Sequence, residues 1–144
     1  MIIAVDFDGT IVEHEYPKIG KERPFAIETL KMLIKDRHRL ILWSVREGEL
    51  LDEAVEWCRE RGVEFYAVNK DFPEEQGTSN NQNFSRKVKA DLFIDDRNIG
   101  GLPDWGTIYQ MINENKTYRD YIMERRGEYT KPDDAGKKRH WWQF

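Results

Sequence analysis

The sequence predicts an α/β protein with a mostly parallel sheet and helices on both faces of that sheet. Three observations favour this fold class: short apolar runs recur along the chain, they show no apolar–polar alternation, and amphipathic segments separate them. Unbroken apolar runs are typical of strands that are buried on both faces, and helices are the usual crossover between parallel strands. We expect four strands, at residues 2–5, 40–43, 65–68 and 92–94.

Helices are expected between the first three strands. Apolar residues repeat at helical spacing from Ala26 to Ile34, and Pro24 suits the first turn of such a helix. The same spacing recurs from Leu51 to Cys58, and Gly62 stands where a helix C-cap belongs. The alternation of strand and helix therefore favours right-handed crossovers.

Two further helices are expected beyond the fourth strand. Asp104 is a candidate N-cap, and Thr117 with Asp120 resembles a capping box. No internal repeat and no linker rich in Gly, Pro or Ser marks a second domain. We therefore predict one domain over residues 1–125, followed by a C-terminal tail of basic and aromatic residues over 126–144.

Length and composition limit the class of protein. The chain has 144 residues, which suits one hydrophobic core. No stretch approaches the roughly 18 apolar residues of a membrane span, and the N-terminus lacks the features of a signal peptide. A single cysteine, Cys58, excludes a disulfide scaffold and a cysteine-based zinc site. We therefore expect a cytoplasmic protein with no membrane partner.

The charge of the chain bears on its partners. The formal net charge is -4, which argues against nucleic acid as the main partner. The tail is an exception, because residues 126–144 carry five Lys/Arg against three Asp/Glu. This tail could hold an anionic partner, but a terminus that is frayed or packed on the surface is the more usual explanation. Nucleic acid is therefore an alternative partner that the composition does not favour.

Carboxylates follow two of the predicted strands. Asp6 and Asp8 come directly after the first strand, and Asp95 and Asp96 come directly after the fourth. Residues i and i+2 of an extended chain point the same way, so Asp6 and Asp8 are expected to face one site. Open parallel sheets bind ligands at the carboxyl ends of their strands. If the first and fourth strands are neighbours, the two pairs converge there.

Such a convergence is electrostatically costly. Two carboxylates about 5 Å apart repel each other by roughly 3 kcal/mol at an effective dielectric constant near 20. A bound cation, a raised pKa or both must relieve this repulsion. Because the candidate ligands are oxygen atoms, with no His or Cys beside them, Mg²⁺ is the expected ion.

A hydroxyl and several amines accompany the carboxylates. Ser44 directly follows the second strand, where its hydroxyl and backbone N–H could meet a phosphate oxygen. Lys87 precedes the fourth strand, and Lys89 follows two residues later. Taken singly, each is more typical of a turn or a solvated surface. Their order around the two carboxylate pairs is what makes them informative.

This order resembles the four sequence motifs of the haloacid dehalogenase-like (HAD) superfamily: Asp6-Phe7-Asp8-Gly9-Thr10, then Ser44, Lys87 and Asp95-Asp96. The resemblance covers residues 2–98 and implies a three-layer, Rossmann-like α/β/α fold. In the third motif we choose Lys87, with Lys89 and Lys70 as the alternatives. Residues 99–144 match no shared motif.

The resemblance implies a Mg²⁺-dependent hydrolase. Asp6 would attack phosphorus to form an aspartyl-phosphate, and Asp8 would act as the general acid and base. Asp6, the backbone carbonyl of Asp8, and Asp95 would hold Mg²⁺, with Asp96 binding directly or through water. Ser44 and Lys87 would hold the transferring phosphoryl group. An acid two residues after the nucleophile is the phosphatase pattern of this superfamily, which favours phosphate monoesters over halogenated substrates.

The resemblance also bears on the substrate. The two points where cap domains are inserted in this superfamily correspond to residues 9–23 and 69–87, which are short, so the chain looks like a capless member. Either a large substrate or a neighbouring subunit of a homo-oligomer must then cover the open site. We expect a small phosphorylated metabolite, whose identity the sequence does not indicate. The candidate substrate-binding residues are Gly9, Thr10, Lys18 and Arg46.

Other functions stay open beside this one. A nucleotide or polynucleotide-end phosphatase is a variant of the same activity. A receiver-like module that accepts a phosphoryl group needs an acid after the third strand, where this chain has Asn69-Lys70. A non-catalytic phosphate-binding domain is disfavoured, because every motif position carries a workable residue. His14 is interpreted as a surface residue and Trp43 as a packing residue.

Overall fold

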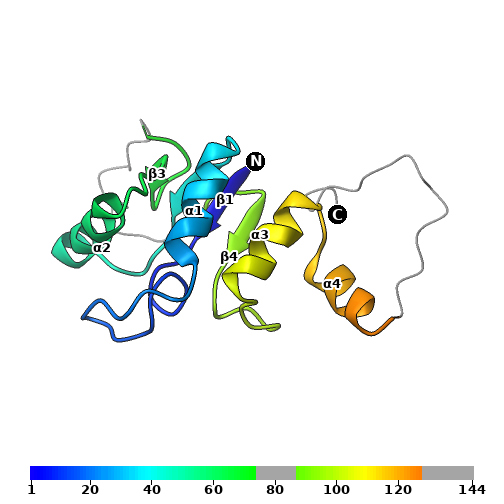
Figure 1. Ribbon diagram of the computed structural model, residues 1–144. Coiled ribbons are helices and arrows are strands. Elements are labelled where there is room, and N and C mark those ends of the chain that lie inside the picture. The colour runs from blue at the N-terminus through cyan, green and yellow to red at the C-terminus, as the bar shows by residue number, and fades with distance from the viewer. Residues whose placement is uncertain (74–86, 128–144) are drawn as a thin grey trace. The chain divides into compact units, whose positions relative to one another are not determined.

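A computed structural model describes residues 1–73 and 87–127 of the chain (Figure 1). It divides the chain into two compact units, Met1–Leu102 and Pro103–Phe144. The described residues form an α/β structure whose elements follow one another in the order β1 (Ile2–Val5), α1 (Ala26–Lys35), β2 (Arg39–Leu42), α2 (Gly48–Glu60), β3 (Ala67–Val68), β4 (Leu92–Ile94), α3 (Trp105–Asn113) and α4 (Tyr118–Arg125).

The four strands form one sheet in the order β3-β2-β1-β4, and all of its pairs are parallel. The predicted α/β class is therefore confirmed, and the arrangement is compatible with a three-layer Rossmann-like fold. In the register, Val5 of β1 lies opposite Leu42 of β2 and Ile94 of β4. Strands β1 and β4 are neighbours, as the convergence of the two carboxylate pairs requires.

The core of the first unit lies where the apolar runs meet. Ile3, Val5 and Ile41 have no exposed surface, as expected for strands covered on both faces. The predicted third strand is shorter than expected, because only Ala67 and Val68 pair with β2 at this edge of the sheet.

Helix α1 begins later than the position of Pro24 suggested. Phe25 is its N-cap, in the left-handed region at φ 65°, and the helix starts at Ala26. Phe25 makes no side-chain capping bond, and the Glu22 carboxylate instead accepts a hydrogen bond of 3.0 Å from the Ile27 N–H. The first turn is thus satisfied by a side chain five residues upstream, outside the usual capping positions.

Helix α2 ends as its sequence predicts. The C-cap is Arg61, and Gly62 follows it at φ +88°, a conformation that favours glycine. The N–H of Val63 donates to the Cys58 carbonyl at 2.9 Å, which satisfies one of the last helical acceptors. Gly62 therefore lies one position beyond the cap itself.

The long connection after β1 is held by backbone hydrogen bonds. The N–H of Glu13 donates to the Lys21 carbonyl at 2.7 Å, and the N–H of Arg23 donates to the Ile11 carbonyl at 2.8 Å. These two bonds close the base of a loop over residues 13–21, which we call the Tyr16 loop. The loop is thereby fixed to the part of the chain that follows the first carboxylates.

The second unit contains α3 and α4, and both of their predicted caps are confirmed. The Asp104 side chain accepts from the Thr107 N–H at 2.9 Å, and Thr117 with Asp120 forms a capping box. The division after Leu102 falls in the segment 97–104, which carries no helix or strand, and the predicted domain over 1–125 stays a prediction. Residues 128–144 of the predicted tail lie outside the described residues.

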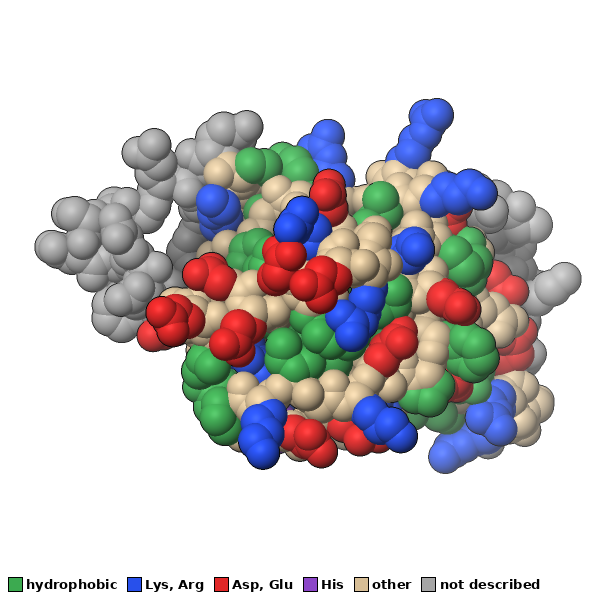
Figure 2. All heavy atoms as spheres, turned by 60° about the vertical axis from the view of Figure 1, so that its left-hand side comes forward, with side chains coloured by type: hydrophobic (Ala, Val, Ile, Leu, Met, Phe, Trp, Pro, Cys, Tyr) green, Lys and Arg blue, Asp and Glu red, His purple; other side chains and the backbone are tan. Residues whose placement is uncertain are grey.

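The described surface carries both signs of charge. On the face shown in Figure 2, Lys and Arg side chains are interspersed with Asp and Glu side chains. Nucleic-acid binding usually requires a continuous basic stripe, which the described residues do not form on this face. Among the residues described, no helix has the length and apolar character needed to cross a membrane.

Candidate functional site

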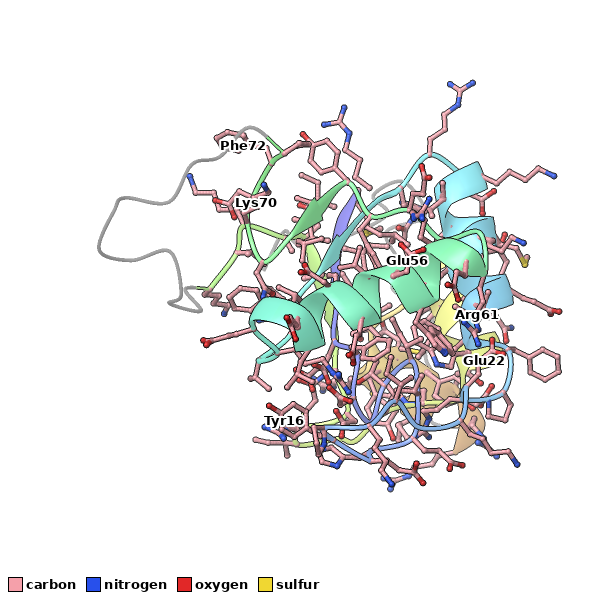
Figure 3. The ribbon with its side chains drawn as sticks, turned by 90° about the vertical axis from the view of Figure 1, so that its left-hand side faces the viewer. Tyr16, Glu22, Glu56, Arg61, Lys70 and Phe72 are labelled. Carbon is pink, nitrogen blue, oxygen red and sulfur yellow. The ribbon has the colours of Figure 1, made fainter. Side chains whose placement is uncertain are left out.

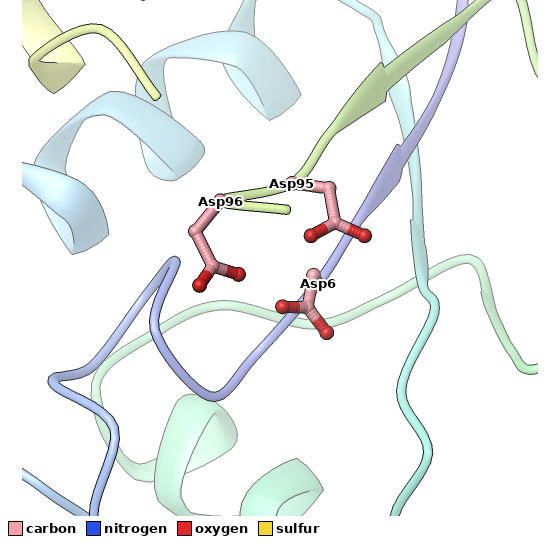
Figure 4. Close-up of side chains that lie close together, drawn as sticks. All are labelled: Asp6, Asp95 and Asp96. Carbon is pink, nitrogen blue, oxygen red and sulfur yellow. The ribbon is translucent and has the colours of Figure 1, made fainter. Parts of the chain in front are cut away.

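Three carboxylates lie together at the carboxyl end of the sheet. Asp6 follows β1, and Asp95 and Asp96 follow the adjacent β4, so the strand pairing carries them to one place. The Asp6 N–H donates to the Ile94 carbonyl at 3.0 Å and continues this pairing beyond the strand. One oxygen of each carboxylate lies within 4.8 Å of those of the others (Figure 4). The predicted convergence is therefore present for these three residues.

Burial and the neighbouring negative charge both raise the pKa of Asp6. Its pKa is raised from the usual 3.8 to about 7, first by burial, then by the charge of Asp95 and by a hydrogen bond with Asp96. Bonds from the Phe7 backbone and from Thr10 oppose this rise only in part. Without a cation, Asp6 is therefore only partly ionised near neutral pH.

Thr10 ties two of the carboxylates together. Its hydroxyl lies 3.1 Å from an oxygen of Asp6 and 3.1 Å from an oxygen of Asp96, and it accepts from the Asp96 N–H at 3.0 Å. Thr10 has no exposed surface. Thr10 therefore supports the cluster, and its expected contact with substrate stays a prediction.

Gly9 lies against Asp96, and its expected contact with substrate stays a prediction. It adopts φ +84°, and a Cβ atom at this position would collide with the carboxylate of Asp96. The Gly9 carbonyl accepts from the Arg23 guanidinium at 3.2 Å. Glycine is required here because it lets the backbone approach Asp96 closely, which does not involve a substrate.

Asp8 pairs with Arg46 and lies outside the cluster that the other three carboxylates form. Both of its oxygens accept from Arg46, at 2.7 Å from Nε and 2.8 Å from Nη2. Arg46 is fully buried, and Asp8 is only 8% exposed. The four hydrogen bonds of the Arg46 guanidinium are to Asp8, Lys18 and Leu50, and the expected contact of Arg46 with substrate stays a prediction. The side chain of Asp8 is not a member of the three-carboxylate cluster.

Ser44 is held by a residue that the sequence interpretation did not select. The Ser44 N–H donates to Oδ1 of Asn69 at 2.8 Å, and Nδ2 of Asn69 donates back to the Ser44 carbonyl at 3.0 Å. Asn69 follows β3 and adopts φ 53°, which asparagine tolerates better than most residues. In the sequence, the one feature that points to Asn69 is its position directly after a strand. Its reciprocal bonds fix the backbone on which the Ser44 hydroxyl is placed.

These groups border a pocket of about 180 Å³. Asp6, Asp8 and Ser44, all predicted from the sequence, line it, and so does Asp95. His14 is exposed, as expected, and it also borders this pocket, as does the half-buried Trp43. Among the described residues, the lining consists of Asp6, Asp8, His14, Tyr16, Trp43, Ser44, Val45, Asp95 and Arg97.

The candidate lysines lie elsewhere. Nζ of Lys87 lies 5.3 Å from the centre of the Phe93 ring, and Lys87 is exposed. The backbone N–H of Lys89 donates to Asp71 at 2.6 Å. Lys70 lies in the segment after β3 (Figure 3). Neither Lys70 nor Lys18 of the Tyr16 loop is among the described residues that line the pocket. The choice among Lys87, Lys89 and Lys70 stays a prediction.

Fold and site together define an α/β protein with a parallel sheet and a carboxylate cluster at the carboxyl end of that sheet. The chain is similar to a solved structure, that of a conserved protein from Bacteroides thetaiotaomicron, with 73% sequence identity and a TM-score of 0.76. The match covers 84% of this chain and 96% of that protein. The chain therefore belongs to the same family as this Bacteroides protein. No protein-family model and no curated protein matches the sequence.

Proposed function

We propose that the protein is a Mg²⁺-dependent phosphatase that hydrolyses a phosphate monoester through an aspartyl-phosphate on Asp6, and that it acts in the cytoplasm. One observation carries the proposal: Asp6 belongs to a carboxylate cluster and lines a pocket together with Asp8 and Ser44. The resemblance of these residues to the motifs of the haloacid dehalogenase-like superfamily supports the same activity.

The donor set fits a hard divalent cation. Asp6, Asp95 and Asp96 offer oxygen ligands close enough to share one ion. The raised pKa of Asp6 supports this, because a cation would relieve the same repulsion that the proton relieves. Asp6, Asp95 and Asp96, with the backbone carbonyl of Asp8, would hold the ion. When bound, Mg²⁺ would offset the negative charge of carboxylates and phosphate.

In the proposed reaction, Asp6 provides the nucleophilic oxygen. This oxygen forms a bond to phosphorus while the bond from phosphorus to the ester oxygen breaks, and the leaving alcohol takes up one proton. Water then attacks the aspartyl-phosphate, releases inorganic phosphate and regenerates the Asp6 carboxylate. Thr10 keeps the nucleophile oriented, because its hydroxyl lies 3.1 Å from the Asp6 carboxylate.

Asp8 is the proposed general acid and base. It lines the pocket, and the two hydrogen bonds from Arg46 orient its carboxyl group before substrate arrives. Because both Asp8 oxygens accept from Arg46, Asp8 would have to turn from this pairing and carry a proton before it gives one to the leaving oxygen; in the second step it would take a proton from the attacking water. Ser44 would donate its hydroxyl proton to a phosphoryl oxygen, and Lys87, which does not line the pocket, would have to move to reach the same group.

The test is hydrolysis of p-nitrophenyl phosphate and a panel of sugar and nucleotide monophosphates, with Mg²⁺ and with EDTA. The matched variants are Asp6→Asn and, as a control, Asp52→Asn, which changes an exposed aspartate of α2. We expect Mg²⁺-dependent turnover in the wild type and the control, and none in Asp6→Asn. Turnover in the wild type no higher than in Asp6→Asn, across the whole panel, would overturn the proposal.

A further inference from the structure

Arg46 connects the candidate acid to the Tyr16 loop. Besides its two bonds to Asp8, its Nη2 donates to the Lys18 carbonyl at 3.0 Å. Its Nη1 donates to the Leu50 carbonyl at the start of α2 at 3.2 Å. A fully buried guanidinium with four such acceptor contacts holds its neighbours in place, because displacing one of them would leave a buried N–H group without that acceptor.

The same guanidinium supports the ring of Tyr16. Its central carbon lies 5.3 Å from the centre of this ring, within the range of a cation–π contact. Tyr16 therefore has one ring face on Arg46, while 47% of the residue is exposed. Figure 3 shows Tyr16 near the first turn of α2, at the opposite end of this helix from Arg61. The loop carbonyl two residues further on is held by Arg46 as well, so the ring is positioned before any ligand binds.

Exposed apolar and aromatic groups stand beside the acidic residues in the pocket wall. Val45 is 66% exposed, and His14 and Trp43 contribute two further rings. An enclosed apolar cavity of about 150 Å³ is just large enough to hold benzene. At about 180 Å³, this pocket is therefore too small to enclose both a phosphoryl group and a bulky alcohol. The alcohol part of a bound ester would then extend toward the exposed lining residues, which are His14, Tyr16, Val45 and Arg97.

We infer that the Tyr16 ring, one face of which lies on Arg46, is a stacking surface for the substrate. It makes the protein prefer phosphate esters whose alcohol carries an aromatic ring. This inference rests on the proposed phosphatase function. A ring that is already fixed loses little conformational entropy when a ligand stacks on it, so its open face binds a flat partner at low cost. Tyr16 is the specificity-determining residue, and Arg46 is its positioning residue.

The test compares benzyl phosphate with cyclohexylmethyl phosphate, which share a primary alcohol and a six-membered ring and differ in aromaticity. In the wild type, we expect kcat/KM to be higher for the benzyl ester. Tyr16→Leu should lower the ratio of the two kcat/KM values by roughly 5- to 10-fold, and Tyr16→Phe should preserve it. Tyr66→Leu is the matched control, because Tyr66 also lies under an arginine, with 5.0 Å from the ring centre to Arg39, but does not line the pocket.

An unchanged ratio in Tyr16→Leu would overturn the inference, and so would an equal fall in Tyr66→Leu or in Tyr16→Phe. If the wild type hydrolyses neither ester nor any other monoester, the phosphatase proposal fails separately. In that case, calorimetry with benzylphosphonate and cyclohexylmethylphosphonate decides the inference. Tighter binding of the benzyl compound that is lost in Tyr16→Leu would support the stacking surface, and equal or absent binding of both would overturn it.

Discussion

Replacing Arg46 by methionine removes the cation that the carboxylate of Asp8 contacts at 2.7 and 2.8 Å. The variant leaves Asp8, which is 8% exposed, as an unpaired buried charge, and it removes the donors of the Lys18 and Leu50 carbonyls. Breaking one side of a buried ion pair typically costs about 3–5 kcal/mol. We expect Arg46→Met to lower the free energy of unfolding by this amount at neutral pH.

The assay is urea unfolding of the wild type, Arg46→Met, Asp8→Leu and the double variant. Removing both charges leaves no orphaned ion, so the double variant should be more stable than the sum of the single losses predicts, by about 2 kcal/mol or more. Arg59→Met is the control, because Arg59 pairs with Glu56 on the exposed side of α2, and the loss of such an exposed pair should be much smaller. Additive losses, or a loss in Arg46→Met no larger than in the control, would refute the reasoning.

Three further predictions concern the carboxylate cluster. Because the pKa of Asp6 is raised from 3.8 to about 7 in the folded protein, the metal-free protein should lose stability as the pH rises between these values, and Asp6→Asn should remove this dependence in thermal melts across pH. Mg²⁺ at neutral pH should raise the melting temperature of the wild type, and an equal rise in Asp95→Asn would contradict the proposed ligand set. Gly9→Ala should destabilise by more than about 1 kcal/mol in urea, since φ +84° and the Asp96 carboxylate both oppose a Cβ atom; a variant as stable as the wild type would show that this backbone can relax.

The parts of the fold that follow from local pattern could be predicted. Unbroken apolar runs located all four strands, and the side chains of Asp104 and Thr117 cap helices as expected. The start of α1 could not be predicted from Pro24, because the Glu22 carboxylate satisfies the first turn from a position that no capping rule includes. Local chemistry fixes an element's presence, and its boundary depends on neighbours outside the element.

In the candidate site, too, only the contacts that follow from local pattern could be predicted. Asp6, Asp95 and Asp96 could be brought together from the sequence, because adjacent parallel strands end at one edge. Asp8 and Arg46 are 38 residues apart in the sequence. Their pairing therefore depends on how the segment after β2 packs against the segment after β1. Tyr16 gave no signal of its own, since an isolated exposed aromatic residue in a loop has many ordinary explanations.

The hydroxyl of Thr10 has one hydrogen and two carboxylate neighbours, Asp6 and Asp96, each at 3.1 Å. It can donate to only one of them at a time, while its oxygen accepts from the Asp96 N–H. Rotation of the Thr10 hydroxyl thus decides which carboxylate accepts its hydrogen bond. The charge of the other carboxylate must then be balanced by a proton or a cation. The cluster therefore has two hydrogen-bonded arrangements of the same heavy atoms, which differ in the direction of one O–H bond.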